Sequence, residues 1–231
     1  MESYDKVFSD RDVILGGHDR GARICHRLAV DYAHASEGEH AWSAKHKLRG
    51  LVMLDIAPTL VQWQAFSDPR AVTAYFHWPF LASPLAADMI EAYGGDKWTR
   101  SGLERITGSN PEGAARAKAD RAWEVYESVF RKRSTIEGSC SDYASGATAE
   151  PKMQEDDQKH GRRIEVPTLV MWSLARLGKM MGDVGSSWKP WVKEGVPLKA
   201  VGCGDDVGHY LPEEATDVVN RAIHGFLDQV I

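Results

Sequence analysis

Four short apolar segments constrain the fold of this chain more than any other feature. They are DVILGG (residues 12–17), LRGLVMLDIAP (48–58), VPTLVMW (166–172) and VPLKAVG (196–202). None alternates apolar with polar residues, so each segment is typical of a strand that is buried on both faces. Because helical patterns separate the segments, we predict an α/β fold with a mostly parallel sheet between two layers of helices.

The spacing of apolar residues between these strands indicates how the chain is organised. The clearest helical patterns lie over residues 87–93 and 111–133. We interpret residues 59–163 as an inserted helical cap over the carboxyl ends of the strands, and residues 1–58 with 164–231 as the core domain.

Three polar or amphipathic stretches complete this domain plan. We expect a surface loop over residues 34–47 and a solvated linker over residues 149–163, where the chain returns from the cap to the core. The C-terminal PEEATDVVNRAIHGFLDQVI is predicted to be one amphipathic helix, with Pro212 in its first turn.

Composition excludes several classes of function. A net charge of −5 over 231 residues argues against a nucleic-acid or membrane-surface partner, and no apolar run is long enough for a membrane span. The start MESYDKVFSDRDVIL has no signal-peptide pattern. The three cysteines, Cys25, Cys140 and Cys203, lack the paired spacing of a disulfide framework or a zinc site. We therefore expect a cytoplasmic protein without metal or cofactor that acts on a small molecule; a homodimer is left open.

The stretch LGGHDRGARI (residues 15–24) carries the first candidate catalytic group. Gly17-His18-Asp19-Arg20-Gly21 fits the G-x-D-x-G form of a nucleophile elbow, with aspartate in place of serine. At the N-terminus of a helix, a carboxylate stays ionised and can attack carbon to form an ester. A phosphate-binding loop is less consistent with these residues, because neither common glycine pattern is present. A plain capping aspartate remains the alternative.

Two further residues follow in the order that α/β-hydrolases show. His209, in GDDVGHYLPEE, lies between the last strand and the C-terminal helix, where a catalytic base is expected. Asp55 ends the second strand, and an acid there can orient the histidine. Asp183, which comes after the third strand, is a rival for the role of the acid.

The chain resembles the haloacetate (fluoroacetate) dehalogenases, a family of the α/β-hydrolase fold. The resemblance runs through GHDRGAR, LVMLDIAPT, AYFHWPFLASP, GSCSDYASGA and GHYLPEEA, in the order of the family and across most of the chain. It implies a hydrolase with Asp19 as nucleophile, His209 as base and Asp55, rather than Asp183, as acid. It also implies that Arg20 and Arg23 hold the substrate carboxylate, and that His77, Trp78 and Tyr143 hold the departing halide.

Elementary chemistry is consistent with these implied roles. Arg20 and Arg23 lie one helical turn apart and can face the same anion, which guanidinium groups bind through paired N–H donors. Imidazole, indole and phenol groups can donate to a leaving fluoride, which is a poor leaving group. Each of these residues could also be ordinary packing or a solvated charge.

One feature departs from the family. Its members have several strands before the elbow, whereas only residues 1–11 precede it here, so we expect a sheet that is incomplete at its N-terminal side. Two other hypotheses are kept, and the short N-terminal part favours the second of them. The first is aspartyl-ester chemistry on an epoxide or another substrate, and the second is an inactive remnant or binding protein.

Overall fold

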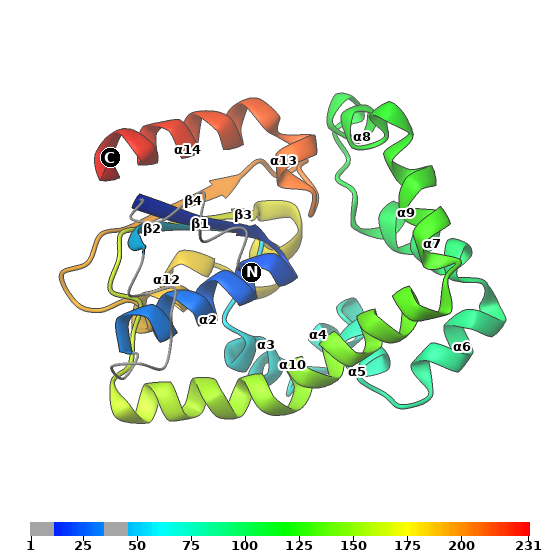
Figure 1. The fold of residues 1–231 in the computed structure, drawn as a ribbon. Coiled ribbons are helices and arrows are strands. Elements are labelled where there is room, and N and C mark those ends of the chain that lie inside the picture. Colours follow the sequence, from blue (N-terminus) through cyan, green and yellow to red (C-terminus); the bar gives the residue numbers. More distant parts are fainter. Residues whose placement is uncertain (1–11, 35–45) are drawn as a thin grey trace.

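A parallel sheet forms the centre of the computed structural model, which describes residues 12–34 and 46–231 (Figure 1). Its four described strands lie in chain order: β1 (Asp12–His18), β2 (Lys47–Leu54), β3 (Thr168–Ser173) and β4 (Leu198–Cys203). Every neighbouring pair is parallel, so the carboxyl ends of all four strands meet at one edge. The predicted α/β class is confirmed.

Helices cover both faces of this sheet, which explains why its strands lack polar alternation. On one face, α2 (Arg20–His34) and α12 (Val184–Trp188) pack with Leu51 and Met53 of β2. On the other face, α14 (Thr216–Val230) packs with Val52 and Leu54 of the same strand. Figure 1 shows α14 on the opposite side of the sheet from α2 and α12. Successive side chains of β2 therefore point to opposite faces of the sheet and pack into two different apolar layers.

The predicted C-terminal helix is two helices, α13 (Leu211–Glu214) and α14, which meet at Ala215. The buried Glu214 carboxylate lies directly before the break. It accepts hydrogen bonds from the backbone N–H groups of Gly108, at 2.8 Å, and Gly208, at 2.7 Å. Because Gly108 belongs to the helices described next, its bond holds α13 against them, whereas the bond from Gly208 fixes the loop after β4.

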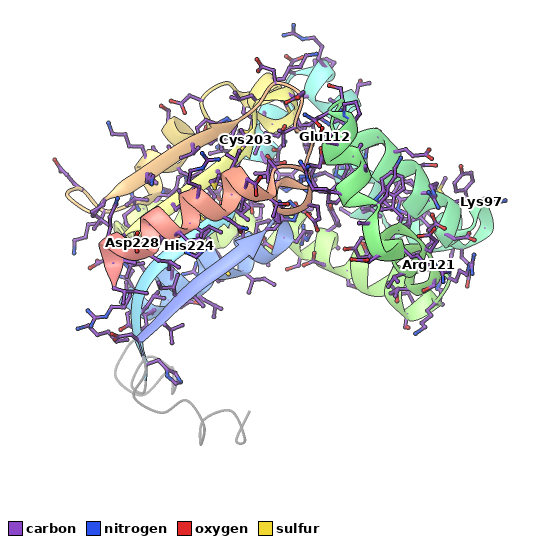
Figure 2. All side chains as sticks on the ribbon, turned by 90° about the horizontal axis from the view of Figure 1, so that it is seen from above. Lys97, Glu112, Arg121, Cys203, His224 and Asp228 are labelled. Atoms are coloured by element: carbon purple, nitrogen blue, oxygen red, sulfur yellow. The ribbon has the colours of Figure 1, made fainter. Side chains whose placement is uncertain are left out.

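Residues 59–160, called here the helical block, form a series of helices between β2 and β3. They are α3 (Thr59–Ala65), α4 (Pro69–Ala74), α5 (His77–Leu81), α6 (Ala86–Tyr93), α7 (Gly95–Ile106), α8 (Pro111–Ala117), the 3-10 turn η1 (Ala119–Arg121), α9 (Ala122–Phe130) and α10 (Arg133–His160). Figure 2 shows this block, with Lys97 and Arg121 labelled, beside the sheet and α14, where His224 and Asp228 are labelled.

The helix expected over residues 111–133 is broken in its middle. Asp120 and Arg121 adopt left-handed backbone angles, with φ of 53° and 60°, and end the run of right-handed turns. The periodicity of the sequence therefore marks α8 and α9 separately and not a single helix.

The linker expected over residues 149–163 is wrong, because residues up to His160 belong to α10. Polar side chains at helical spacing there face the core and not solvent. Glu150 accepts from Arg23, Gln154 accepts from the backbone of Leu60, and Asp157 pairs with Arg27. These polar side chains form hydrogen bonds and ion pairs with residues of α2 and α3. A solvated linker would not need such contacts.

Short elements join β3 to β4. They are the π-helical turn η2 (Leu174–Gly178), α11 (Lys179–Met181), α12 and the 3-10 turn η3 (Lys189–Trp191). The loop expected over residues 34–47 lies mostly outside the described residues, as do residues 1–11 of the expected core. In the described ranges, no helix has the length and apolarity that a membrane span needs.

Candidate active site

The turn between β1 and α2 places Asp19 at the carboxyl edge of the sheet. Asp19 has a left-handed φ of 50°, and its N–H donates to Leu54 O at 2.9 Å. A Cβ on Gly17 would lie 2.5 Å from the backbone N of Ala22 and closer still to the carbonyl of Gly21. Only glycine fits at position 17, because the strand end touches the first turn of α2. The turn has the strained form that the G-x-D-x-G motif predicts.

Asp55 is held in a matching position after β2. Its φ is 49°, its N–H donates to Met171 O at 2.8 Å, and its Oδ1 accepts from the N–H of Ser173 at 2.8 Å. Its Oδ2 lies 2.6 Å from Nδ1 of His209. An ionised carboxylate can only accept, so Nδ1 carries the proton of this bond. Nε2 of the same ring lies 3.8 Å from Oδ2 of Asp19.

The backbone of His209 is fixed from two sides. Its N–H donates to Ile106 O at 2.9 Å, and Nε2 of His18 donates to its carbonyl at 2.8 Å. The imidazoles of His18 and His209 lie with centroids 4.6 Å apart. His18 was not among the predicted site residues, although it occupies the variable position before Asp19 in the motif. It positions the loop of the expected base.

The rival acid Asp183 is engaged elsewhere. It caps α12, where it accepts from the N–H of Ser186 at 3.3 Å and from Oγ of Ser186 at 2.7 Å. The structure therefore brings Asp55, and not Asp183, against His209.

The two carboxylates dominate the electrostatics of His209. Burial favours the neutral imidazole, but bonds and charges from Asp19 and Asp55 outweigh burial and raise the pKa of His209 to about 10. Burial opposes ionisation of Asp19 as well, yet His209, His18 and Arg20 hold its pKa well below the usual range. At neutral pH the arrangement contains an imidazolium between two carboxylates.

A cavity of about 1240 Å³ opens beside these groups. Asp19, Asp55 and His209 line it from the core, and His77, Trp78 and Tyr143 line it from the helical block. The ring centroid of Tyr143 lies 5.9 Å from the ring centroid of His77 and 6.0 Å from that of Trp78. The three residues predicted to hold a halide therefore form one cluster on a wall of the cavity that contains the expected nucleophile.

Burial keeps two members of this cluster neutral. Burial, and next the charge of Arg105, lowers the pKa of His77 to about 4. Burial, and next the charge of Asp19, raises the pKa of Tyr143 above its usual range. Near pH 7 both residues carry N–H or O–H groups that can donate to an anion.

The two arginines that were expected to share a substrate carboxylate both lie near Glu150 but differ in their access to the cavity. Arg20 lines the cavity, stacks on Tyr143 with Cζ 4.4 Å from the ring centroid, and pairs with Asp142. Arg23 is buried behind the wall of the cavity, where its Nε donates to Glu150 at 2.9 Å. The shared role of the two arginines stays a prediction, and Arg20 is the one that faces the cavity.

Four further residues that line the cavity were not predicted as site residues: Tyr75, Arg105, Arg176 and Tyr210. Tyr75 and Tyr210 lie inside the motifs AYFHWPFLASP and GHYLPEEA, whereas Arg105 and Arg176 lie outside every quoted motif. Across the described residues, no group of three or more metal-ligating side chains is present.

The chain is similar to several known proteins. No family model matches the chain. The chain is 28% identical over 222 residues to a fluoroacetate dehalogenase of Burkholderia sp, covering 92% of this chain and 62% of that protein. It thus spans less than two thirds of that relative.

Two solved structures are similar over nearly the whole chain. A protein of Nostoc sp PCC 7120, assigned as an α/β hydrolase, is 30% identical with a TM-score of 0.80, over 98% of this chain and 69% of its own. A protein of Pseudomonas aeruginosa, assigned as an epoxide hydrolase, is 26% identical with a TM-score of 0.80, over 99% of this chain and 68% of its own.

Proposed function

Because the chain belongs to the α/β-hydrolase family, we propose that it hydrolyses the carbon–halogen bond of short 2-haloacids through an ester formed on Asp19. One observation carries the proposal: Asp19, His209 and Asp55 line the same cavity as three neutral donors of the helical block. The fluoroacetate dehalogenase relative supports the choice of substrate.

The first step would use the ionised Asp19. One of its oxygens attacks the carbon that bears the halogen, and the halide leaves with the electron pair of the broken bond. Arg20, next to the nucleophile, would bind the substrate carboxylate and align that carbon. His77, Trp78 and Tyr143 would donate to the departing halide.

The second step would use His209 as a base. Once Asp19 is an ester, the negative charge that raises the pKa of His209 is gone, and burial then favours the neutral imidazole. After the imidazolium has lost a proton to solvent, Nε2 can accept a proton from water as the oxygen of that water attacks the ester carbonyl of Asp19. The bond from this carbonyl carbon to the substrate oxygen then breaks, the 2-hydroxy acid leaves with the proton returned by Nε2, and the Asp19 carboxylate is restored. Asp55 would stabilise the imidazolium that forms.

The helical block would act as a cap. Its residues supply the wall of the cavity opposite the sheet, so closure over a substrate would exclude bulk water and strengthen each polar contact. Trp78 and Tyr143 are already buried, which favours dry contacts with a small anion.

Halide release from chloroacetate and fluoroacetate, followed with an ion-selective electrode, tests the proposal. Wild type should release halide, and Asp19→Asn should abolish release with its cooperative thermal transition intact. Equal release by both proteins would refute the aspartyl ester. A folded wild type without turnover would favour the hypothesis of a binding protein.

A second activity has one observation in its favour. Tyr75, Tyr143 and Tyr210 line the cavity, and burial raises the pKa of each. Protonated phenols can donate to the ring oxygen of an epoxide during attack by Asp19, and the Pseudomonas relative is assigned as an epoxide hydrolase. A panel of matched epoxides and haloacids, assayed with the same protein, separates the two activities.

A further inference from the structure

The cavity carries a second group of positive charges, apart from the arginine beside Asp19. Arg105 lies in the last turn of α7, and Arg176 lies in η2 after β3; both line the cavity. Neither forms an ion pair with any residue that the structure describes. By contrast, Arg70 is paired with Asp68, and Arg20 is paired with Asp142 but keeps a buried Nη1 without a hydrogen-bond partner among the described residues.

The hydrogen-bond donors of the two guanidinium groups are poorly satisfied. Arg105 has two long bonds, 3.4 Å to Ala74 O and 3.5 Å to Nδ1 of His77. Nη2 of Arg176 is buried and has no hydrogen-bond partner among the described residues. A buried donor of this kind calls for a partner, and planar guanidinium groups are suited to bind a carboxylate through two bonds.

The positive charges of Arg105 and Arg176 act on the same part of the cavity. Burial, and next the positive charge of Arg176, lowers the pKa of Arg105. Burial raises the pKa of Tyr75, and the charges of Asp55 and Asp19 also raise it. The charges of Arg176 and Arg105 both lower it, so both arginines lie near this side chain. Two like charges brought together without a counter-charge repel each other, and a bound anion would relieve that repulsion.

The size of the cavity also indicates a substrate longer than a haloacetate. At about 1240 Å³, the space exceeds the range of about 300–1,000 Å³ that is usual for small-molecule sites. A two-carbon acid held between Arg20 and Asp19 would leave the region of Arg105 and Arg176 unfilled.

We propose that Arg105 and Arg176 form a second anion-binding subsite, and that the preferred substrates are 2-halo dicarboxylates such as 2-chlorosuccinate. The inference rests on the proposed function. One carboxylate would lie beside Arg20 and the other between Arg105 and Arg176. The bond from Asp19 to the halogen-bearing carbon would form as the carbon–chlorine bond breaks, and chloride would leave with the electron pair.

Turnover of two matched substrates tests this subsite. In 2-chlorobutyrate, a methyl group replaces the second carboxylate of 2-chlorosuccinate. Wild type should show a kcat/KM for 2-chlorosuccinate at least ten-fold above that for 2-chlorobutyrate. Arg105→Gln and Arg176→Gln should each lower this ratio by roughly ten-fold, the worth of one charge-assisted contact.

Arg70→Gln is the matched control, because Arg70 lines the cavity but is neutralised by Asp68. It should keep the wild-type ratio. A wild-type ratio of one or less would overturn the inference, and so would a ratio that Arg105→Gln and Arg176→Gln both leave unchanged.

Binding of succinate keeps the test independent of turnover. Calorimetry should show tighter binding of succinate than of butyrate to wild type, and Arg176→Gln should remove the difference. If no haloacid is hydrolysed but this difference is found, the proposed function fails and the subsite stands. If haloacids are hydrolysed and succinate binds no better than butyrate, the subsite fails alone.

Discussion

Gly17 lies against the backbone of Gly21, so that the end of β1 and the first turn of α2 are in direct contact. A side chain on Gly17 would overlap the peptide that follows Gly21, whereas a Cβ on Gly21 would meet nothing within 4 Å. The two glycines of the motif therefore have different reasons to be glycine. Position 17 must be glycine because a side chain there would overlap the backbone of residue 21. Position 21 has room for a side chain, and its backbone is what Gly17 packs against.

Gly17→Ala should prevent stable folding or strongly lower the melting temperature, because the turn cannot close around the added methyl group. Gly21→Ala should leave the stability unchanged or raise it by up to about 1 kcal/mol, since alanine favours the helix. Thermal unfolding followed by circular dichroism compares them. Equal stability of the two variants would contradict this account of the elbow.

His209→Asn should stop the reaction after one step. Without the base, Asp19 can still be alkylated, so the protein should accumulate one covalent adduct and release about one equivalent of halide. Intact-protein mass spectrometry with chloroacetate, followed by peptide mapping, checks that the adduct is on Asp19. An adduct on another residue, or continued turnover, would argue against the proposed roles.

The charge of His209 should depend on Asp19. NMR titration of wild type should show an imidazolium at neutral pH that loses its proton near pH 10. In Asp19→Asn one of the two carboxylates is gone, so the pKa of His209 should fall. An identical pKa in the two proteins would show that Asp19 does not control the base.

The same shift predicts how stability changes with pH. A histidine with a raised pKa in the folded state stabilises the protein fully below its ordinary pKa of about 6.5, and this stabilisation is lost as the pH rises toward 10. The free energy of unfolding should therefore fall between these values, by about 1.4 kcal/mol per pH unit at most. Urea titrations at several pH values measure it, and His209→Asn should flatten the decline.

Glu150→Gln should destabilise the fold because it leaves the buried guanidinium of Arg23 without a counter-charge. The side chain of Arg23 is only 4% exposed, and removal of one partner of such a pair costs about 3 kcal/mol. Glu112→Gln is the control, since Glu112 is fully exposed beside Arg116 and should change little. Equal effects in urea unfolding would show that the buried pair contributes no more than a surface one.

The sequence was most informative about the sheet and the elbow. Buried parallel strands carry continuous apolar runs, and a nucleophile elbow needs small residues at fixed spacing, so both features are visible in local patterns. The choice between Asp55 and Asp183 was different. Each follows a strand, and only the tertiary structure shows Asp55 at His209 and Asp183 at the start of α12.

The polar face of α10 could not be predicted in the same way. Glu150, Gln154 and Asp157 read as solvated residues because their partners on α2 and α3 lie more than ninety residues away in the chain. Arg105 and Arg176 were missed for the same reason. Each lies in an unremarkable local sequence, and they meet only where the helical block faces the sheet edge.

The continuity of α10 has a mechanical consequence. The helix contributes Tyr143 to the cavity and, two turns later, holds Arg23 through Glu150. Between them, the carbonyl of Gly146 accepts from Nε1 of Trp63 at 2.7 Å. The distance between Asp19 and Tyr143 is therefore set by the packing of one helix, whereas His77 and Trp78 lie on α5. If α4 to α9 shift to admit a substrate, His77 and Trp78 move with them, and Tyr143 keeps its place beside Asp19.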